Sequence, residues 1–173
     1  ESIYSEIQNP DGKTVPSLFL FDIQEDQVES LASTLKDNGA ESSLLSPMVR
    51  ARLKKVNDEI FTKKEKSGDF ESREEERSRA FSNRGYNLTY RDKLDSSETI
   101  VDGTFYSGAW SEESGKTPEI SIEQRFADRL DLKLGDQLEF EVLGVAVVGQ
   151  ITSVRKIRWT TFQPNFFIQF QPG

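Results

Sequence analysis

The stretch Leu132-Lys-Leu-Gly-Asp-Gln-Leu-Glu-Phe-Glu-Val142 carries the clearest structural signal in the chain. Gly135-Asp136 is a turn sequence, and the residues that follow it alternate between apolar and acidic side chains. Gly144 separates this run from a second, mainly apolar run at 145–154. Two such runs joined at a glycine predict a β-hairpin that turns one face of its first strand toward a core.

The residues on either side of this hairpin extend the prediction. Upstream, Ser121-Ile-Glu-Gln124 has the spacing of a helix capping box, and Ile122, Phe126 and Leu130 would form one apolar helix face. Downstream, we expect a last strand at Asn165–Phe170, which Pro164 opens because a missing N–H is tolerated at the start of a strand. The C-terminal half therefore mixes one short helix with at least three strands.

The N-terminal half predicts a strand, a helix and two further strands. Residues 17–23 are apolar on both alternating faces, which is typical of a central strand buried on two sides. Residues 28–35 have helical apolar spacing, and Asn38-Gly39 supplies a stop. Alternation of apolar and basic residues predicts a strand with one wet face at 49–54, and alternation around Leu88 predicts another at 86–90.

Taken together, these patterns favour an α+β fold of mixed sheet lobes with two or three helices, because helices and strands do not alternate regularly. Residues 1–16 read as a polar leader or loop, and residues 17–173 as one domain or two lobes sharing a core. The segment 58–80 is rich in charges that nearly cancel, and we expect a loop at Ser67-Gly68 followed by an exposed helix containing Arg73 and Arg77.

Composition excludes several classes of function. The 173 residues include 30 acidic and 22 basic side chains, for a net charge of -8, so a sequence-independent grip on nucleic acid is not expected. Histidine and cysteine are both absent, which removes thiol nucleophiles, Ser-His-Asp triads and the usual zinc sites. The sequence has no Walker A motif or dinucleotide fingerprint, so we predict no cofactor and no metal.

Basic residues gather in two places despite the acidic balance. The candidate basic contact residues are Arg50, Arg52, Arg155 and Arg158. Solvated strand faces account for such residues most simply, because Lys and Arg commonly blunt exposed strands. The alternative is a contact with an anionic lipid headgroup or an acidic partner surface.

Aromatic residues gather near the C-terminus. The candidate substrate or membrane-proximal contacts are Trp159, Phe162, Phe166 and Phe167. Some of them are expected in the core, but neighbouring Phe166 and Phe167 would point to opposite faces of a strand. Either both faces are apolar or one of them is a contact patch.

Several strings resemble one protein family. They are Leu20–Val28, Ser46–Leu53, Arg84–Asp92, Leu132–Phe140, Ser153–Trp159 and Gln163–Phe167. In this order they resemble the large extracytoplasmic domain of bacterial FtsX-like ABC transporter permeases. Within that family they are most similar to the permeases described as lipid- or lysophospholipase-associated, which are relatives of the MacB and lipoprotein-release permeases.

The resemblance implies a non-catalytic periplasmic domain of an inner-membrane permease, with a MacB-like periplasmic fold and a variable insert at 58–80. A separate cytoplasmic ABC ATPase subunit would hydrolyse ATP, and helix movements would be relayed to this domain. It would then handle a lipid-like or other hydrophobic substrate, or a periplasmic partner such as a lipase or esterase. One departure from the family is the apolar run Leu143–Val148, which is unexpected at a hairpin tip and leaves its exposure open.

Two other classes of function stay open from the residues alone. A free-standing periplasmic adaptor would bind a partner without membrane flanks. A hydrolase that uses only carboxylates, for example Glu112-Glu113 or Glu139 and Glu141, would show turnover that one Asp or Glu substitution removes. Alternating Glu residues on a strand are more commonly its solvated face.

Overall fold

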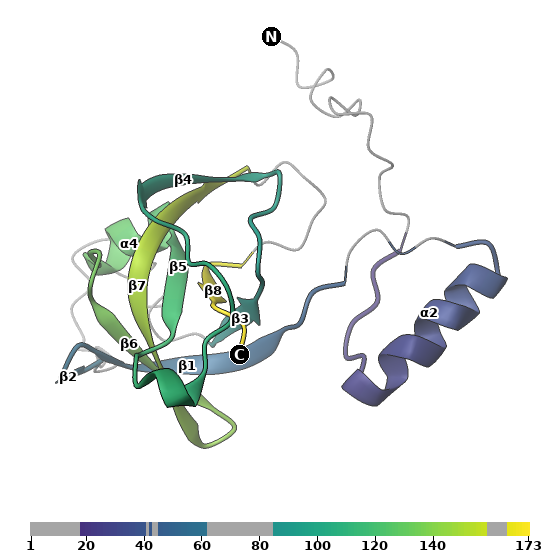
Figure 1. Cartoon of the computed structure of the whole chain (residues 1–173), viewed down its shortest axis with the longest axis horizontal. Coiled ribbons are helices and arrows are strands. Elements are labelled where there is room, and N and C mark those ends of the chain that lie inside the picture. The colour runs from purple at the N-terminus through teal and green to yellow at the C-terminus, as the bar shows by residue number, and fades with distance from the viewer. Residues whose placement is uncertain (1–17, 41, 43–44, 62–84, 159–165) are drawn as a thin grey trace, which may run out of the picture. The chain divides into compact units, whose positions relative to one another are not determined.

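The computed structural model describes residues 18–40, 42, 45–61, 85–158 and 166–173 (Figure 1). The chain divides into two units, Glu1–Ser46 with Trp159–Pro164, and Pro47–Arg158 with Asn165–Gly173. The predicted leader at 1–16, the predicted loop at Ser67-Gly68 and the predicted helix around Arg73 and Arg77 lie outside the described residues.

In the first unit, the described residues form one helix and its lead-in. A short 3-10 helix η1 (Glu25–Gln27) runs into α2 (Val28–Asp37), which ends at Asn38 and a left-handed Gly39. The predicted helix is therefore confirmed, with its stop where the sequence placed it.

The predicted strand at 17–23 is wrong, because residues 18–24 form no strand and Leu18, Phe19, Leu20 and Phe21 are all exposed. An apolar run adopts a strand only where a neighbouring strand pairs with its backbone. None of the strand pairings in the described part of the chain includes these residues. Composition alone could not supply that partner.

The second unit is built from strands. In chain order they are β1 (Val49–Val56), β2 (Glu59–Ile60), β3 (Tyr86–Tyr90), β4 (Glu98–Gly103), β5 (Glu119–Glu123), β6 (Gln137–Val142), β7 (Val145–Ile157) and β8 (Ile168–Phe170). A 3-10 turn η2 (Glu112–Ser114) precedes β5, and the helix α4 (Gln124–Leu130) follows it.

Six of these strands close into a ring. β1 pairs with β3, β3 with β8, β8 with β5, β5 with β7, β7 with β6, and β6 again with β1. The β3–β8 and β5–β7 pairs are parallel, and the other pairs are antiparallel. β2 adds to β1, and β4 adds to the far end of β7 (Figure 1). The result is a closed six-stranded barrel with two short additions.

The sequence predictions for β1, β3 and the hairpin are confirmed. On β1, Ala51 and Leu53 are buried while Arg50 and Arg52 are exposed. The hairpin of β6 and β7 has Val142 opposite Val145, with Leu143 and Gly144 in the turn at φ 49° and 86°. Two consecutive positive φ angles are the signature of a type I′ turn, whose twist matches that of the strands.

The predictions around β5 and β8 need correction. Ser121 lies inside β5, and Glu123 caps α4 instead, with its Oε2 accepting a hydrogen bond from the Phe126 N–H at 2.9 Å. β8 is also shorter than the predicted 165–170 strand. β4 was not predicted at all, because its sequence Glu98-Thr-Ile-Val-Asp-Gly103 lies in a stretch without regular alternation.

The barrel interior is filled by aliphatic and aromatic side chains. The fully buried ones include Ile120, Ile122, Phe126, Leu138, Phe140, Ile151 and Ile168. The Phe126 ring meets Tyr86 edge-on at a centroid distance of 5.3 Å, and Phe140 meets Phe170 in the same way at 6.0 Å. Each such side chain stabilises the fold by about 1.5–3 kcal/mol through burial. A closely packed core of this kind tolerates added atoms poorly.

Gly149 on β7 offers a test of this packing. A Cβ there would lie 2.4 Å from Ile120 Cγ2 and 2.9 Å from Phe170 Cε1, so Gly149→Ala should lower the free energy of unfolding by about 1–3 kcal/mol through overpacking. Gly85→Ala is the matched control, because its new Cβ would meet mainly the flexible Arg50 side chain. Urea unfolding measures both; equal effects would contradict the packing described.

Candidate functional site

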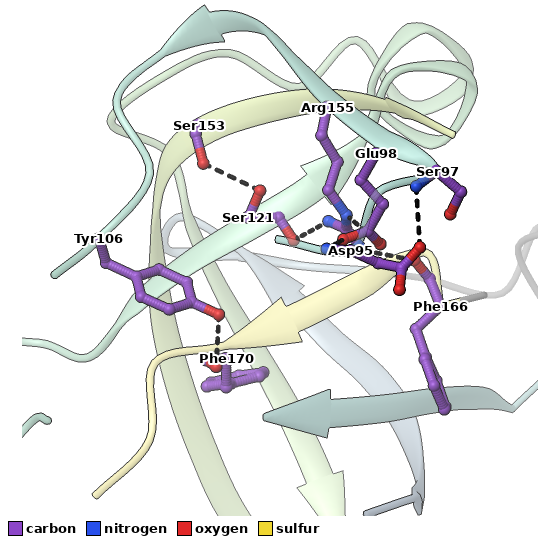
Figure 2. Close-up of polar contacts among 9 residues, drawn as sticks. All are labelled: Asp95, Ser97, Glu98, Tyr106, Ser121, Ser153, Arg155, Phe166 and Phe170. Atoms are coloured by element: carbon purple, nitrogen blue, oxygen red, sulfur yellow. Dashed lines mark hydrogen bonds and ion pairs between the residues drawn. The ribbon is translucent and has the colours of Figure 1, made fainter. Parts of the chain in front are cut away.

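A buried arginine joins four separate parts of the second unit (Figure 2). Arg155 on β7 has no exposed surface. Its Nε donates to Glu98 Oε1 of β4 at 3.2 Å, its Nη1 donates to the carbonyl of Ser121 on β5 at 2.6 Å, and its Nη2 donates to the carbonyl of Phe166, two residues before β8. The guanidinium therefore crosslinks β4, β5, β7 and the chain that enters β8.

The carboxylate partner is itself held in place. Glu98 Oε2 accepts a hydrogen bond from the Asp95 N–H at 3.1 Å, and Asp95 Oδ1 accepts one from the Ser97 N–H at 2.8 Å (Figure 2). Nearby, Ser153 Oγ donates to Ser121 Oγ at 2.9 Å. The polar cluster is thus mostly satisfied within the protein, which is the condition under which a buried ion pair is tolerated.

Burial lowers the pKa of Arg155, and the neighbouring Glu98 carboxylate acts against that shift. An arginine stays protonated in proteins because its ordinary pKa is above 12, so this side chain remains a buried cation. All three of its nitrogens are engaged by protein oxygens. The arrangement therefore holds strands together, and complete burial keeps the guanidinium away from a substrate anion in solution.

Tyr106 completes the buried polar groups near this cluster. Its hydroxyl donates to the Phe170 carbonyl at 2.7 Å. Burial raises the pKa of the Tyr106 phenol above its ordinary value, and the charge of Arg155 acts in the opposite direction. The phenol is neutral at physiological pH and ties the segment after β4 to the end of β8.

The structure separates the four predicted basic contact residues. Arg155 is internal, so its prediction as a surface contact is corrected by its complete burial and by its ion pair with Glu98. Arg158 is exposed, and its Nη2 donates to the Ser96 carbonyl at 3.1 Å. Arg50 and Arg52 lie together on the outer face of β1, near the turn of the β6–β7 hairpin. Arg158 instead follows the opposite end of β7. Only Arg50 and Arg52 form a shared basic surface.

The aromatic candidates are not one patch in the described residues. Trp159 and Phe162 lie outside the described residues. Phe166 is buried, with the Arg91 guanidinium 5.3 Å above its ring, and Phe167 is half-buried and stacks on Phe126 at 6.2 Å. Both rings contribute to packing, but only Phe166 would need the core to open before it could form a contact, because part of Phe167 stays exposed.

Other kinds of site are not found in the part of the chain that the structure describes. Among those residues there is no group of three or more acidic side chains that would hold a metal ion. In the first unit, a shallow hollow of about 410 Å³ lies between α2 and its lead-in, lined in part by Leu20, Phe21 and Leu31. No helix in the described ranges has the length and apolar character needed to cross a bilayer.

Sequence reasoning missed Glu98 and Tyr106. Nothing in the local pattern marks either residue, because their partners are 57 and 64 positions away in the chain. The period of two gave no signal for Arg155, because the register shift between Ile151 and Ser153 places Arg155 with Ser153 and Ser121, on the face opposite the core residues Ile151 and Val154.

Comparisons with known proteins give a similarity in sequence to part of a transporter component. No family model matches the chain, and no solved structure matches it. Among curated proteins the chain is similar to a transporter component, and this similarity supports an ABC transporter permease-like family. That relative is the "Uncharacterized ABC transporter permease YbbP" of Escherichia coli (strain K12), which is 31% identical over 158 residues. The match covers 91% of this chain and 17% of the relative.

The buried ion pair yields a stability prediction. Arg155→Met leaves the Glu98 carboxylate buried without its cation, so unfolding free energy should fall by about 3–5 kcal/mol. Lys55→Met is the control, because Lys55 and Glu139 form a partly exposed pair at 2.7 Å whose loss costs about 1 kcal/mol or less. Denaturant unfolding checks both, and a similar small loss for the two variants would rule out the crosslink.

Tyr106 yields a prediction in pH. Tyr106→Phe removes one buried hydrogen bond and should cost about 1 kcal/mol at neutral pH. Since the folded-state pKa of this phenol is raised, its contribution is present below the unfolded pKa near 10 and falls above it by about 1.4 kcal/mol per pH unit. The difference in unfolding free energy between wild type and Tyr106→Phe should therefore disappear near pH 11. Thermal unfolding from neutral to alkaline pH measures it; a gap that stays constant would refute the assignment.

Proposed function

We propose that this chain is a periplasmic domain of an ABC transporter permease of the bacterial inner membrane, with a MacB-like core fold. The observation that supports it best is the 31% identity that runs along 91% of the chain to a segment of a protein named as such a permease. The proposal places ATP hydrolysis on a separate cytoplasmic ATPase subunit, in line with a sequence that has no Walker A motif.

In this role the domain relays movement and does no chemistry of its own. A closed barrel has no free edge within its ring, and the Arg155 cluster ties distant segments of that barrel together. Such a body transmits displacement because packed interiors deform little. Through this barrel, ATP-driven movements of the transmembrane helices would act on a lipid-like or other hydrophobic substrate. They could equally act on a periplasmic partner such as a lipase or esterase.

The location is tested by thiol labelling. The chain has no cysteine, so Glu113→Cys in the complete permease gives a single exposed thiol within this chain. In spheroplasts, a membrane-impermeant maleimide should label it without lysis. Ile120→Cys is the control, since that position is fully buried and should react only after denaturation. Labelling of position 113 that requires lysis would place the chain in the cytoplasm and defeat the proposal.

The coupling is tested by amide hydrogen exchange in the complete transporter with its ATPase. Trapping the ATP-bound state should change exchange in the β8 amides Ile168–Phe170, which the Arg155 and Tyr106 hydrogen bonds flank. The isolated chain with ATP is the control and should show no change. Identical exchange in both nucleotide states would remove the relay role while leaving the location intact.

A further inference from the structure

The turn of the β6–β7 hairpin is unusual in two ways. Leu143 is 96% exposed and Val145 is 63% exposed, so two apolar side chains project into solvent at the tip. Leu143 also has a positive φ of 49°. A branched, bulky residue in that region is a genuine outlier, and type I′ turns normally place Asn or Asp before the glycine.

Folding does not account for this leucine. Its side chain is almost entirely outside the protein, so no burial offsets the backbone strain. An asparagine before Gly144 would relieve the strain and increase solubility. Strain of this kind is a reason to look for a contact with something outside the chain.

The neighbouring strand adds positive charge beside the tip. β1 and β6 are antiparallel with Arg52 opposite Glu141, so Arg50, two residues earlier on β1, is level with the turn. Figure 1 shows the β6–β7 turn projecting past β1. Both arginines are exposed on the outer face of β1.

The charges on this face do not cancel. Lys54 pairs with Glu141 at 2.9 Å, and Lys55 pairs with Glu139 at 2.7 Å. Within the described ranges, neither Arg50 nor Arg52 has a carboxylate partner. Two positive charges without a carboxylate partner in the described ranges therefore lie on the outer face of β1, and the next strand, β6, leads into the exposed apolar tip.

We propose that this face docks on an anionic lipid surface. Leu143 and Val145 enter the headgroup region, and the guanidinium groups of Arg50 and Arg52 meet the phosphates. Apolar side chains that enter the interface, combined with basic groups that meet anionic headgroups, are the two components of interfacial membrane binding. The chain's net charge of -8 does not oppose this contact, since charges beyond a Debye length of roughly 10 Å are screened at about 0.1 M salt.

A second copy of the chain is a poorer occupant. A standard protein interface buries roughly 800 Å² on each partner, which a two-residue tip cannot supply. Two copies meeting tip to tip would also bring their uncompensated arginines together. The lipid contact rests on the proposed location beside a membrane, but the binding itself can be measured on the chain alone.

The first experiment places a reporter at the tip. Leu143→Cys, the chain's single cysteine, is labelled with an environment-sensitive NBD fluorophore and titrated with vesicles of phosphatidylcholine containing phosphatidylglycerol, or of phosphatidylcholine alone. NBD emission should rise severalfold and shift to the blue with the anionic vesicles, at roughly millimolar lipid, and added salt should weaken the response. Val101→Cys is the control, because it is exposed on β4 at the far end of β7.

The second experiment separates the two components by vesicle flotation. Arg50→Gln with Arg52→Gln should weaken binding about 25-fold, at about fivefold per basic residue near an anionic surface. Lys93→Gln with Lys156→Gln changes the net charge equally at exposed positions elsewhere and should leave binding unchanged. Leu143→Asn should weaken binding without lowering the melting temperature, because Asn suits the turn.

Three kinds of result would overturn the lipid contact. No emission change at position 143, or an equal change at position 101, would remove the lipid contact. A signal that rises with chain concentration in the absence of vesicles would assign the tip to a second copy. If NBD emission at position 143 does not change with vesicles but shows shielding in the detergent-extracted transporter, the tip contacts a protein pocket. Lipid binding by a chain whose position 113 proves cytoplasmic would reject the proposed location and retain the docking surface.

Discussion

The fold depends on the hydrogen bonds of one buried cation. β8 has only three residues, yet the ring closes only if this strand stays between β3 and β5. The Arg155 guanidinium donates hydrogen bonds to the Phe166 carbonyl just before β8 and to the Ser121 carbonyl on the neighbouring strand β5. A short strand that arrives last in the chain is thereby fixed by side-chain bonds as well as by its own backbone pairing.

The same cluster explains why a charged group is kept where an apolar one would pack. A buried ion pair is weak evidence for stability, because desolvation of both ions offsets their attraction. Its geometric demands are strict, however, since three donors must find three acceptors at once. The observed register of β4, β5 and the chain entering β8 satisfies them, and a shift of any one segment would move its acceptor. Specificity of strand arrangement is therefore the better account of Arg155, and it would suit the relay role proposed for the barrel.

Local patterns predicted those parts of the fold that local forces determine. The alternation of Leu138 and Phe140 with acidic residues, and of Ala51 and Leu53 with basic ones, predicted β6 and β1 with the correct faces buried. The same reasoning wrongly predicted a strand at 17–23, because a strand also requires a partner and no strand pairs with this run in the described residues. Closure of the sheet into a ring could not be predicted, since it rests on pairings between strands far apart in sequence, such as β3 with β8.

The candidate site was harder to predict because two residues occupy environments opposite to their chemical type. Arg155 was interpreted as a solvated residue on account of its charge, although the polar face of β7 that it shares with Ser153 is itself buried. The exposure of Leu143 was left open because its apolar side chain is unexpected at a hairpin tip, and it is the most exposed of the large apolar residues described. A charge inside and a leucine outside both cost the folded state free energy.

Those two costs have different explanations. At Arg155, the desolvation free energy of the buried cation is offset within the chain by hydrogen bonds to oxygens of Glu98, Ser121 and Phe166. The cost at Leu143 is not recovered by any burial that the structure describes, and backbone strain is added to it. A residue whose cost is met internally is explained by the fold. A residue whose cost is unmet points to a contact outside the chain, and Arg50 and Arg52 on the adjacent strand, which have no carboxylate partner in the described residues, are the reason for proposing an anionic one.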